Sequence, residues 1–446
     1  MMIWISNDIK IENHNQAIID YCEDKLTLDN PEFITAQRLG RYLGNIEKKI
    51  KLYVKNGQTL VLPFGCLRDI WKIKGDASYS TQFHAFLGNS MQGHIKLYDY
   101  QETALNALKK GKNGVLEAPC GSGKTQIGLA LIKEIGGRAL WLTHTKKLLE
   151  QSKTRCEMYY QGDFGKITEG EVNIGKDITF ATVQTMCKID PSVYKDAFDI
   201  VIVDECHHCV GTPTKVMQFY KILTNCNARY KYGLSATLSR SDNLICSVFY
   251  LLGDILYSIP QSAVGDKIIK ASHIKVDIDI QYNLLDYLDV DGTINNNKLL
   301  NTLSMNEERN QIIIDNIIRL DNGQNKQLIL CHRINQCEYI YDKIKEKGIP
   351  CNLVIGKIKD KNREYEGRVI IATYSLAKEG LDIPTLNVLH LATPQKNESV
   401  TLQSVGRIER NIMGKKTPEC YDYVDNDINY CVNCFKTRRR ILKREA

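Results

Sequence analysis

The sequence lacks the features that mark membrane-spanning and secreted proteins. No run of 18 apolar residues occurs along it, and its first residues do not combine a basic segment with a long apolar core. The fifteen cysteines are scattered and do not form the dense, regular pattern of a small disulfide-stabilised fold, so we expect reduced thiols. Internal repeats and low-complexity tracts are also missing. These absences favour a globular protein of the cytoplasm.

The composition is that of a globular chain with room for several cores. Of its 446 residues, 43% are hydrophobic and 25% are charged, which predicts about three domains. Changes of pattern along the chain place these domains at residues 1–95, 96–265 and 266–446. The excess of 59 basic over 52 acidic residues gives a net charge of only +7, so charge is informative where it clusters.

Basic residues cluster in the first of these regions. Two alternating runs, 49–54 and 58–63, flank Asn56-Gly57 and predict a β-hairpin. The segment from Arg38 to Lys74 contains nine basic and only two acidic residues, and aromatic residues are interspersed among them. Such a mixture suits a surface that follows a phosphate backbone and stacks bases. A small α+β module with a solvated lysine face explains the same residues equally well.

A glycine-rich loop follows a short apolar strand and precedes an apolar helix. In such a loop the backbone N–H groups and the helix N-terminus converge on one anionic site, which predicts phosphate binding. Lys124 would neutralise the β- and γ-phosphates and Thr125 would ligate Mg²⁺. A purely structural turn is the alternative. The loop residues that would contact the nucleotide are Pro119, Cys120, Gly121, Ser122 and Gly123.

Short apolar strands alternate with helical segments over the remainder of the chain. This alternation predicts an α/β fold with parallel sheets covered on both faces, whose ligands bind at the carboxyl ends of the strands. The expected strands of the first sheet are 115–116, 139–143, 178–182, 200–203 and 230–234, and those of the second are 274–280, 327–331, 369–373 and 388–392. Residues 283–301 are polar and rich in asparagine, and we expect a surface excursion there.

Two acids, Asp204 and Glu205, stand at the end of the buried strand 200–203. Asp204 would hold Mg²⁺, directly or through water, and Glu205 would orient and deprotonate the water that attacks the γ-phosphate. Helix capping is the ordinary alternative for either acid alone. Residues 206–209 read Cys-His-His-Cys, but four consecutive residues after a strand cannot all face one tetrahedral zinc ion. The pair Cys431 and Cys434 also lacks a second ligand pair at zinc-binding distance, and a packed terminal helix or turn is the favoured interpretation.

These segments resemble the motifs of superfamily 2 ATP-dependent helicases of the DExH type. Residues 118–125 are similar to the first motif of that family, 204–207 to its second and 235–237 to its third. The resemblance runs from about residue 96 to 425 and implies two tandem RecA-like, P-loop NTPase lobes preceded by a small α+β accessory domain. It further implies hydrolysis of ATP with Mg²⁺, stimulated by nucleic acid.

The same resemblance assigns further residues. Gln101 would select ATP, and Gly380 and Asp382 would touch the nucleotide from the second lobe. Contacts to the nucleic-acid backbone would come from Thr143, Thr182, Gln184, Arg333 and Thr373.

Gln403, Arg407 and Arg410 are spaced i, i+4 and i+7, which places them on one face if a helix runs through all three. They match the sixth motif of the family. The two arginines would then face the Lys124 loop across a cleft and stabilise charge on the transferred phosphoryl group, an effect of about 10³–10⁵ in rate. Gln403 would help to place the attacking water.

The resemblance is nearest to phage-encoded and repair-associated helicases that act on branched DNA. We therefore predict a monomeric DNA helicase or translocase that unwinds or migrates forked or four-way DNA, in the host cytoplasm if phage-encoded. Removal of residues 1–95 would then cost junction binding and spare most ATP hydrolysis. An RNA helicase, a translocase that does not separate strands and a scaffold with a degenerate ATP site are the alternatives, although the presence of Lys124, Glu205 and Arg410 disfavours the scaffold.

Overall fold

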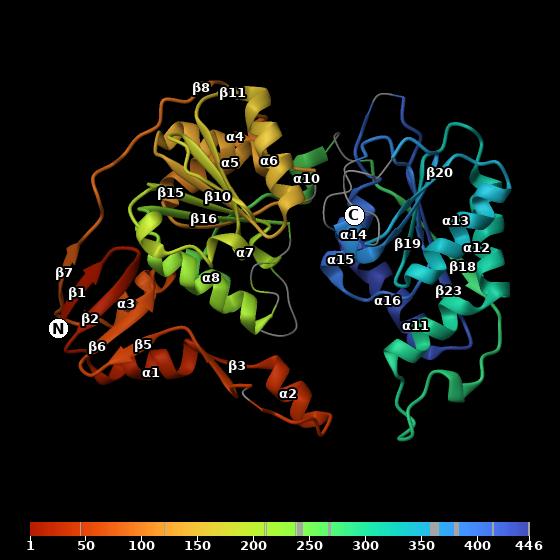
Figure 1. The fold of residues 1–446 in the computed structure, drawn as a ribbon, viewed down its shortest axis with the longest axis horizontal. Helices are drawn as coiled ribbons and strands as arrows, with labels where there is room; N and C mark the ends of the chain where they lie inside the picture. The colour runs from red at the N-terminus through yellow and green to blue at the C-terminus, as the bar shows by residue number, and fades with distance from the viewer. Residues whose placement is uncertain are drawn as a thin grey trace. The chain divides into compact units, whose positions relative to one another are not determined.

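A computed structural model describes residues 1–44, 46–119, 121–208, 210, 212–236, 238, 244–265, 269–356, 365–378, 383–412 and 414–444. The chain forms two compact units, Met1–Ala263 and Val264–Ala446 (Figure 1). Below, residues 1–95 are called the accessory region, the rest of the first unit the first lobe, and the second unit the second lobe.

The accessory region is built on a five-stranded sheet with the strand order β5-β6-β2-β1-β7. Its hairpin β5/β6 turns at Gly57, whose φ of +59° explains the glycine there. The prediction of a hairpin is confirmed. Residues 49–51, however, form a separate strand, β4, which pairs with β3. The predicted run 49–54 is thus divided near Leu52, which is buried. The elements are β1 (Met2–Ile5), β2 (Asp8–Glu12), α1 (Gln16–Lys25), β3 (Thr27–Asp29), α2 (Pro31–Arg38), β4 (Lys49–Lys51), β5 (Val54–Asn56), β6 (Thr59–Pro63), α3 (Leu67–Ile73), β7 (Ser78–Thr81) and β8 (Gln92–Gly93).

The first lobe contains an eight-stranded sheet with the order β13-β12-β14-β10-β15-β16-β9-β17. All its pairings are parallel except that of the edge strand β13 with β12. All five predicted strands of this sheet are present. The strands are β9 (Gly114–Glu117), β10 (Ala139–Thr143), β12 (Phe164–Thr168), β13 (Glu171–Asn173), β14 (Ile178–Thr182), β15 (Ile200–Asp204), β16 (Tyr230–Ser235) and β17 (Ile255–Ser258). The other elements are α4 (Asp99–Gly111), α5 (Lys124–Ile135), α6 (Lys146–Tyr159), β11 (Tyr160–Gln161), α7 (Val183–Met186), α8 (Pro213–Asn225) and α9 (Cys246–Leu252).

The accessory region and the first lobe share one hydrophobic core. Buried side chains of β1 and β2, such as Ile3 and Ile9, belong to the same apolar cluster as Leu140 and Val201 of the large sheet. At the junction Gly65 lies so close to α9 that a Cβ atom would stand 2.3 Å from the carbonyl oxygen of Phe249. The two parts of the first unit are therefore packed as one body.

A buried lysine also joins these parts. Lys231 of β16 is fully buried and donates to the carbonyl oxygens of Asn7 at 2.7 Å and Leu223 at 3.1 Å. Burial lowers the pKa of Lys231 to about 8. Its hydrogen bonds tie the accessory sheet to the end of α8.

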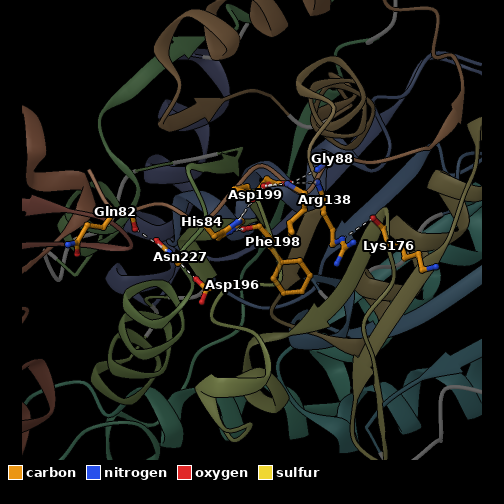
Figure 2. A network of polar contacts seen from close by, with 11 residues as sticks. Gln82, His84, Gly88, Arg138, Lys176, Asp196, Phe198, Asp199 and Asn227 are labelled. Atoms are coloured by element: carbon orange, nitrogen blue, oxygen red, sulfur yellow. Dashed lines mark hydrogen bonds and ion pairs between the residues drawn. The ribbon is translucent and has the colours of Figure 1, made fainter. Parts of the chain in front are cut away.

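The connection from β7 to β8 is fixed to the first lobe by polar contacts, and we call residues 82–93 the strap. Figure 2 shows the network. The buried carboxylate of Asp199 accepts hydrogen bonds from the backbone N–H groups of Leu87 (3.0 Å), Gly88 (3.1 Å) and Arg138 (2.8 Å). His84 Nε2 lies 3.0 Å from the carbonyl oxygen of Phe198. The strap is thus held by a side chain just before β15, the strand that carries the two acids.

The second lobe is a six-stranded, fully parallel sheet with the order β18-β23-β22-β19-β21-β20. Alternate residues of β19 enter opposite cores: Ile329 packs with α12 and α13, and Leu328 with α15. The predicted α/β class with parallel RecA-like sheets is confirmed. The elements are β18 (Ser272–Ile278), α11 (Asn296–Met305), α12 (Glu307–Leu320), β19 (Gln327–Cys331), α13 (Ile334–Glu346), β20 (Cys351–Val354), β21 (Val369–Thr373), α14 (Tyr374–Lys378), β22 (Val388–Leu391), α15 (Glu398–Gly406), β23 (Glu419–Asp425) and α16 (Asn429–Arg444).

The polar stretch 283–301 is not irregular throughout, because α11 begins at Asn296 after an isolated bridge between Leu288 and Ile294. Among the described residues, no helix combines the length and the apolar character needed to cross a membrane.

Candidate active site

The glycine-rich loop joins β9 to α5 at the carboxyl edge of the large sheet. Gly123 caps α5 with a φ of +82°, a backbone conformation that favours glycine. A Cβ atom on Gly123 would also stand 2.2 Å from Nε2 of Gln101. Both observations explain why this position is glycine. The N-cap residue Gly123 has no side chain that could cap the first N–H groups of α5. Cys120 lies outside the described residues.

Gln101, near the start of α4, holds this loop in place. Its side chain is 4% exposed, and Nε2 donates to the carbonyl oxygen of Ser122 at 2.8 Å. Its Oε1 accepts from the backbone N–H of Tyr98 at 3.0 Å. In this structure both ends of the amide are used inside the protein, and a role in selecting adenine stays a prediction.

Lys124, the first residue of α5, lies against the two acids. Its side chain is largely buried, and Nζ donates to the carbonyl oxygen of Ala118 at 3.2 Å. The same nitrogen lies 3.5 Å from Oε1 of Glu205. The structure thus brings the predicted phosphate-binding lysine and the predicted catalytic acid into one ion pair.

Asp204 ends β15, and Glu205, which follows it, has an unusual backbone conformation. Glu205 has a φ of +48°, which is uncommon for a residue with a side chain and is found where a function requires a fixed geometry. Asp204 is 5% exposed and accepts from Ser152 Oγ at 3.4 Å. Ser152, on α6, was not identified from the sequence, because nothing in a single serine on a helix indicates which carboxylate it meets.

The two carboxyl groups have opposite pKa shifts. Burial, followed by the neighbouring charge of Glu205, raises the pKa of Asp204 to about 7. Burial acts the same way on Glu205, but Lys124, then His207 and His144, outweigh it and hold the pKa of Glu205 below its usual value. Glu205 is therefore the acid that stays ionised, as a group that accepts a proton from water must.

His207 connects Glu205 to the next strand. Its Nδ1 lies 2.8 Å from Ser235 Oγ at the end of β16 and 3.5 Å from Oε2 of Glu205. The ring of His208 is 4.0 Å from that of His207 and 4.2 Å from that of His144, measured between centroids. The site thus continues into the segment 235–237, of which Thr237 lies outside the described residues.

The donors present fit Mg²⁺ bound together with phosphates. Among the described residues, no group of three or more His, Cys, Asp or Glu side chains could hold a metal ion. Mg²⁺ is commonly held by one or two carboxylates and by substrate phosphates, so it does not need such a group. Asp204 and Thr125 provide oxygen donors beside the loop. Among the described residues, the buried hydroxyl of Ser122 has no hydrogen-bond partner, as expected for a group that would bind a phosphate oxygen.

Of the three predicted nucleic-acid contacts in the first lobe, Thr143 and Thr182 end the strands β10 and β14, and Gln184 lies on α7. Thr143 is fully buried and donates to the carbonyl oxygen of Thr145 at 3.0 Å, and Thr182 is 6% exposed and donates to Thr185 at 3.0 Å. Gln184 is exposed and donates to the carbonyl oxygen of His144 at 2.8 Å. Their contact with nucleic acid stays a prediction, and Gln184 is the most accessible of the three.

The corresponding residues of the second lobe lie at the carboxyl ends of β19 and β21. Arg333 caps α13, and its Nε donates to Oδ1 of Asn301 on α11 at 2.7 Å. Thr373 is 6% exposed and its hydroxyl lies 3.2 Å from that of Ser375. Gly380 and Asp382 lie outside the described residues, so their nucleotide contact stays a prediction.

The expectation that Gln403, Arg407 and Arg410 share one helical face is wrong. The helix α15 ends at Gly406, Arg407 is its C-cap, and Arg410 lies beyond it. The physical reason is that glycine weakens the helix and the next residues bond elsewhere: Ile269 N–H donates to the carbonyl oxygen of Glu409 at 2.8 Å. The roles of the three side chains stay predictions.

Comparison with known proteins gives two family matches along the chain. Residues 94–240 match the model of the type III restriction enzyme, res subunit, and residues 308–411 match that of the helicase conserved C-terminal domain. The first match contains the loop, both acids and Ser235, and the second contains Gln403, Arg407 and Arg410.

Two relatives that align with most of this chain carry the names of helicases. L396 of Acanthamoeba polyphaga mimivirus, whose name assigns it provisionally to the ATP-dependent RNA helicases, is 27% identical over 88% of this chain and 76% of its own length. The ATP-dependent DNA helicase uvsW of Enterobacteria phage T4 is 22% identical over 94% of this chain and 91% of its own length. Among solved structures, Dbp5 of S. cerevisiae bound to RNA and ADP BeF3 covers 85% of this chain and 92% of its own, with a TM-score of 0.57 and 14% identity, which supports the fold.

Proposed function

From the premise that the chain belongs to the superfamily 2 ATP-dependent helicases, we propose that it couples ATP hydrolysis to the unwinding or branch migration of forked or four-way DNA. ATP hydrolysis and action on nucleic acid follow from membership. The choice of DNA, the branched substrate and the residue roles are our proposal.

The observation that carries the proposal is the cluster of Lys124, Asp204 and Glu205. Lys124 is placed to neutralise phosphate charge at the N-terminus of α5. Glu205, ionised and 3.5 Å from both Lys124 and His207, is placed to orient the attacking water and accept its proton. Arg407 and Arg410 supply positive charge to the transferred phosphoryl group, and Gln403 helps to position the water.

Magnesium fits this arrangement. When bound, the ion would neutralise charge on the phosphates of ATP, and Asp204 and Thr125 are the residues that would hold it. Ser152 keeps the Asp204 carboxylate in place through its hydrogen bond. Burial and the neighbouring charge of Glu205 raise the pKa of Asp204 more than Lys124 lowers it.

The exposed surface of the accessory region supports a nucleic acid as the substrate. Its basic residues from Arg38 to Lys72 are exposed, with Tyr42 94% and Trp71 38% exposed among them, whereas Phe64 is buried in the core and cannot stack a base. Exposed rings among cations suit a strand whose phosphates are neutralised and whose bases stack. The named DNA helicase uvsW also aligns with 94% of this chain, which favours DNA over RNA.

The test is a panel of single-stranded, forked and four-way DNA with the matching RNA molecules. ATP hydrolysis and strand separation are measured on each, with Glu205→Gln as the inactive control. We expect the wild-type chain to separate forked or four-way DNA and the variant to separate none. Hydrolysis and separation confined to RNA would overturn the choice of DNA.

An RNA helicase is the second candidate, favoured by the name of the mimiviral relative. A translocase that consumes ATP without separating strands has the same motifs. The same panel distinguishes a translocase from a helicase. With a translocase, the DNA substrates would stimulate ATP hydrolysis, but none of their strands would be separated.

A further inference from the structure

The terminal helix α16 has an inner face that packs on the second lobe. Cys431, Cys434, Phe435 and Ile441 are buried there, and the helix contacts β23 and α15. One helical face is thus committed to the core, and the pair of cysteines belongs to that packing.

A buried ion pair fixes the rotation of α16. Arg438 is 1% exposed and Asp422 of β23 is fully buried. Nε of Arg438 donates to Oδ2 of Asp422 at 2.7 Å, and Nη2 donates to Oδ1 at 2.5 Å. Two parallel hydrogen bonds between a guanidinium and a carboxylate are geometrically specific, so the opposite face of the helix is held outward.

That opposite face is made of cations. Lys436, Arg439, Arg440 and Lys443 are all exposed, and they lie within an arc of about 100° on the helix. None of the four forms an ion pair with a residue in the part of the chain that the structure describes. Together they line a shallow hollow of about 470 Å³.

We propose that this basic face of α16 binds the phosphate backbone of the nucleic acid on which the protein acts. The inference rests on the proposed function and adds a contact that the helicase motifs do not contain. From Lys436 to Lys443 the helix rises about 10 Å, and a nucleic-acid strand carries a phosphate about every 3.4 Å along its axis. This length spans about three intervals between phosphates, so the four cations match about four successive phosphates.

The surface chemistry favours nucleic acid over other anionic partners. Between residues 429 and 444, no large hydrophobic side chain is exposed among those that the structure describes. A helix that inserts into a membrane surface or docks on a protein groove needs such side chains. Unpaired cations on a fixed helix give binding that depends on charge and is independent of base sequence.

The basic face should act on affinity and leave catalysis unchanged. None of the four side chains belongs to the loop, the acids or the arginines of the proposed ATP site. On a plot of log K against log salt concentration, affinity for duplex DNA falls with a slope of about −0.9 for each phosphate contact. Loss of one contact therefore makes the slope shallower by about 0.9.

The experiment compares three full-length variants with the wild-type chain. The first replaces all four cations (K436Q/R439Q/R440Q/K443Q), and the second replaces the lysines alone (K436Q/K443Q). The matched control, K345Q/K347Q, removes two exposed lysines at the end of α13 in the same lobe. Fluorescence anisotropy with a labelled DNA fork gives the dissociation constant at several salt concentrations, and phosphate release at saturating DNA gives kcat.

We expect the salt dependence to become shallower by up to about 3.6 in the four-site variant, and by about half as much in the two-lysine variant, with kcat unchanged and the control equal to wild type. Equal values for the α16 variants and the control would overturn the inference, even if DNA still stimulates hydrolysis. A wild-type chain whose hydrolysis ignores all nucleic acids would instead overturn the proposed function. If the four-site variant fails to fold, the lysine pair decides alone.

Discussion

The most informative single residue of the site is Glu205. It combines a left-handed backbone with an ion pair to Lys124 and a contact to His207. The motif Asp204-Glu205 was recognisable from the sequence, because two acids at the end of an apolar strand form a local pattern. The positive φ was not recognisable from this pattern. The opposite pKa shifts were not either, because they depend on burial and on Lys124, which is 81 residues from Glu205 in the chain.

Glu205→Gln should abolish turnover while preserving nucleotide binding. The amide keeps the shape of the side chain but cannot accept the proton, so we expect hydrolysis to fall by about 10²–10⁴. Phosphate release and binding of a fluorescent ATP analogue measure the two effects. Glu157→Gln, which alters an exposed acid of the same lobe, is the control. A variant that still hydrolyses ATP at the wild-type rate would remove Glu205 from the mechanism.

His390 gives the second lobe a predictable response to acid. It is buried between Tyr423 and Gln327, and burial lowers its pKa to about 3. The folded state therefore resists protonation, so stability is complete above the ordinary pKa of about 6.5 and is lost as the pH falls toward 3. Between pH 7 and pH 5 the free energy of unfolding of the second lobe should drop by about 2 kcal/mol.

Calorimetry combined with tryptophan fluorescence can measure that drop. All three tryptophans, Trp4, Trp71 and Trp141, lie in the first unit, so fluorescence reports on the unfolding of that unit. An unfolding transition without a change in tryptophan fluorescence belongs to the second lobe. In His390→Gln this pH dependence should be reduced by the same amount. An unchanged pH dependence in the variant would show that another group is responsible.

At the scale of elements, the central strands were predictable and several others were not. The strand 139–143 is continuous and apolar, and it was identified with its observed bounds. β23 carries Asp422 and Asp425, both fully buried, so its sequence does not look like an interior strand. Its charges are paired with Arg438 and Arg309, which come from distant helices. A local pattern cannot reveal such partners.

The strap is the element whose anchoring the structure reveals most directly. Asp199→Asn leaves one oxygen where the carboxylate served three backbone N–H groups. We expect the free energy of unfolding of the first unit to fall by about 1–3 kcal/mol, measured by urea denaturation with tryptophan fluorescence. Asp190→Asn, at an exposed acid that caps a short 3-10 helix, is the comparison. Equal effects of the two substitutions would mean that Asp199 does not anchor the strap.

At the scale of the whole molecule, the structure changes the expected effect of a truncation. Because the accessory region and the first lobe share a core, deletion of residues 1–95 would expose apolar side chains of α8 and α9. The truncated chain should therefore lose ATP hydrolysis together with nucleic-acid binding, contrary to the expectation from sequence. Hydrolysis by the truncated chain at the full rate would show that the lobe folds alone.

The contribution of the accessory surface is better tested by a side chain that supports no core. Tyr42 is 94% exposed, so Tyr42→Ala should leave stability unchanged and weaken binding of forked DNA by about 1–3 kcal/mol if it stacks a base. Tyr159→Ala, in the first lobe and 38% exposed, is the control.

The central claim is that this chain is a motor whose ATP site responds to nucleic acid. The most direct measurement is the rate of phosphate release by the purified chain as DNA is titrated in, at low and high salt. The account predicts a rate that rises to saturation with DNA, needs more DNA at high salt and disappears in Glu205→Gln. A rate that is the same with and without DNA, RNA or their branched forms would contradict it.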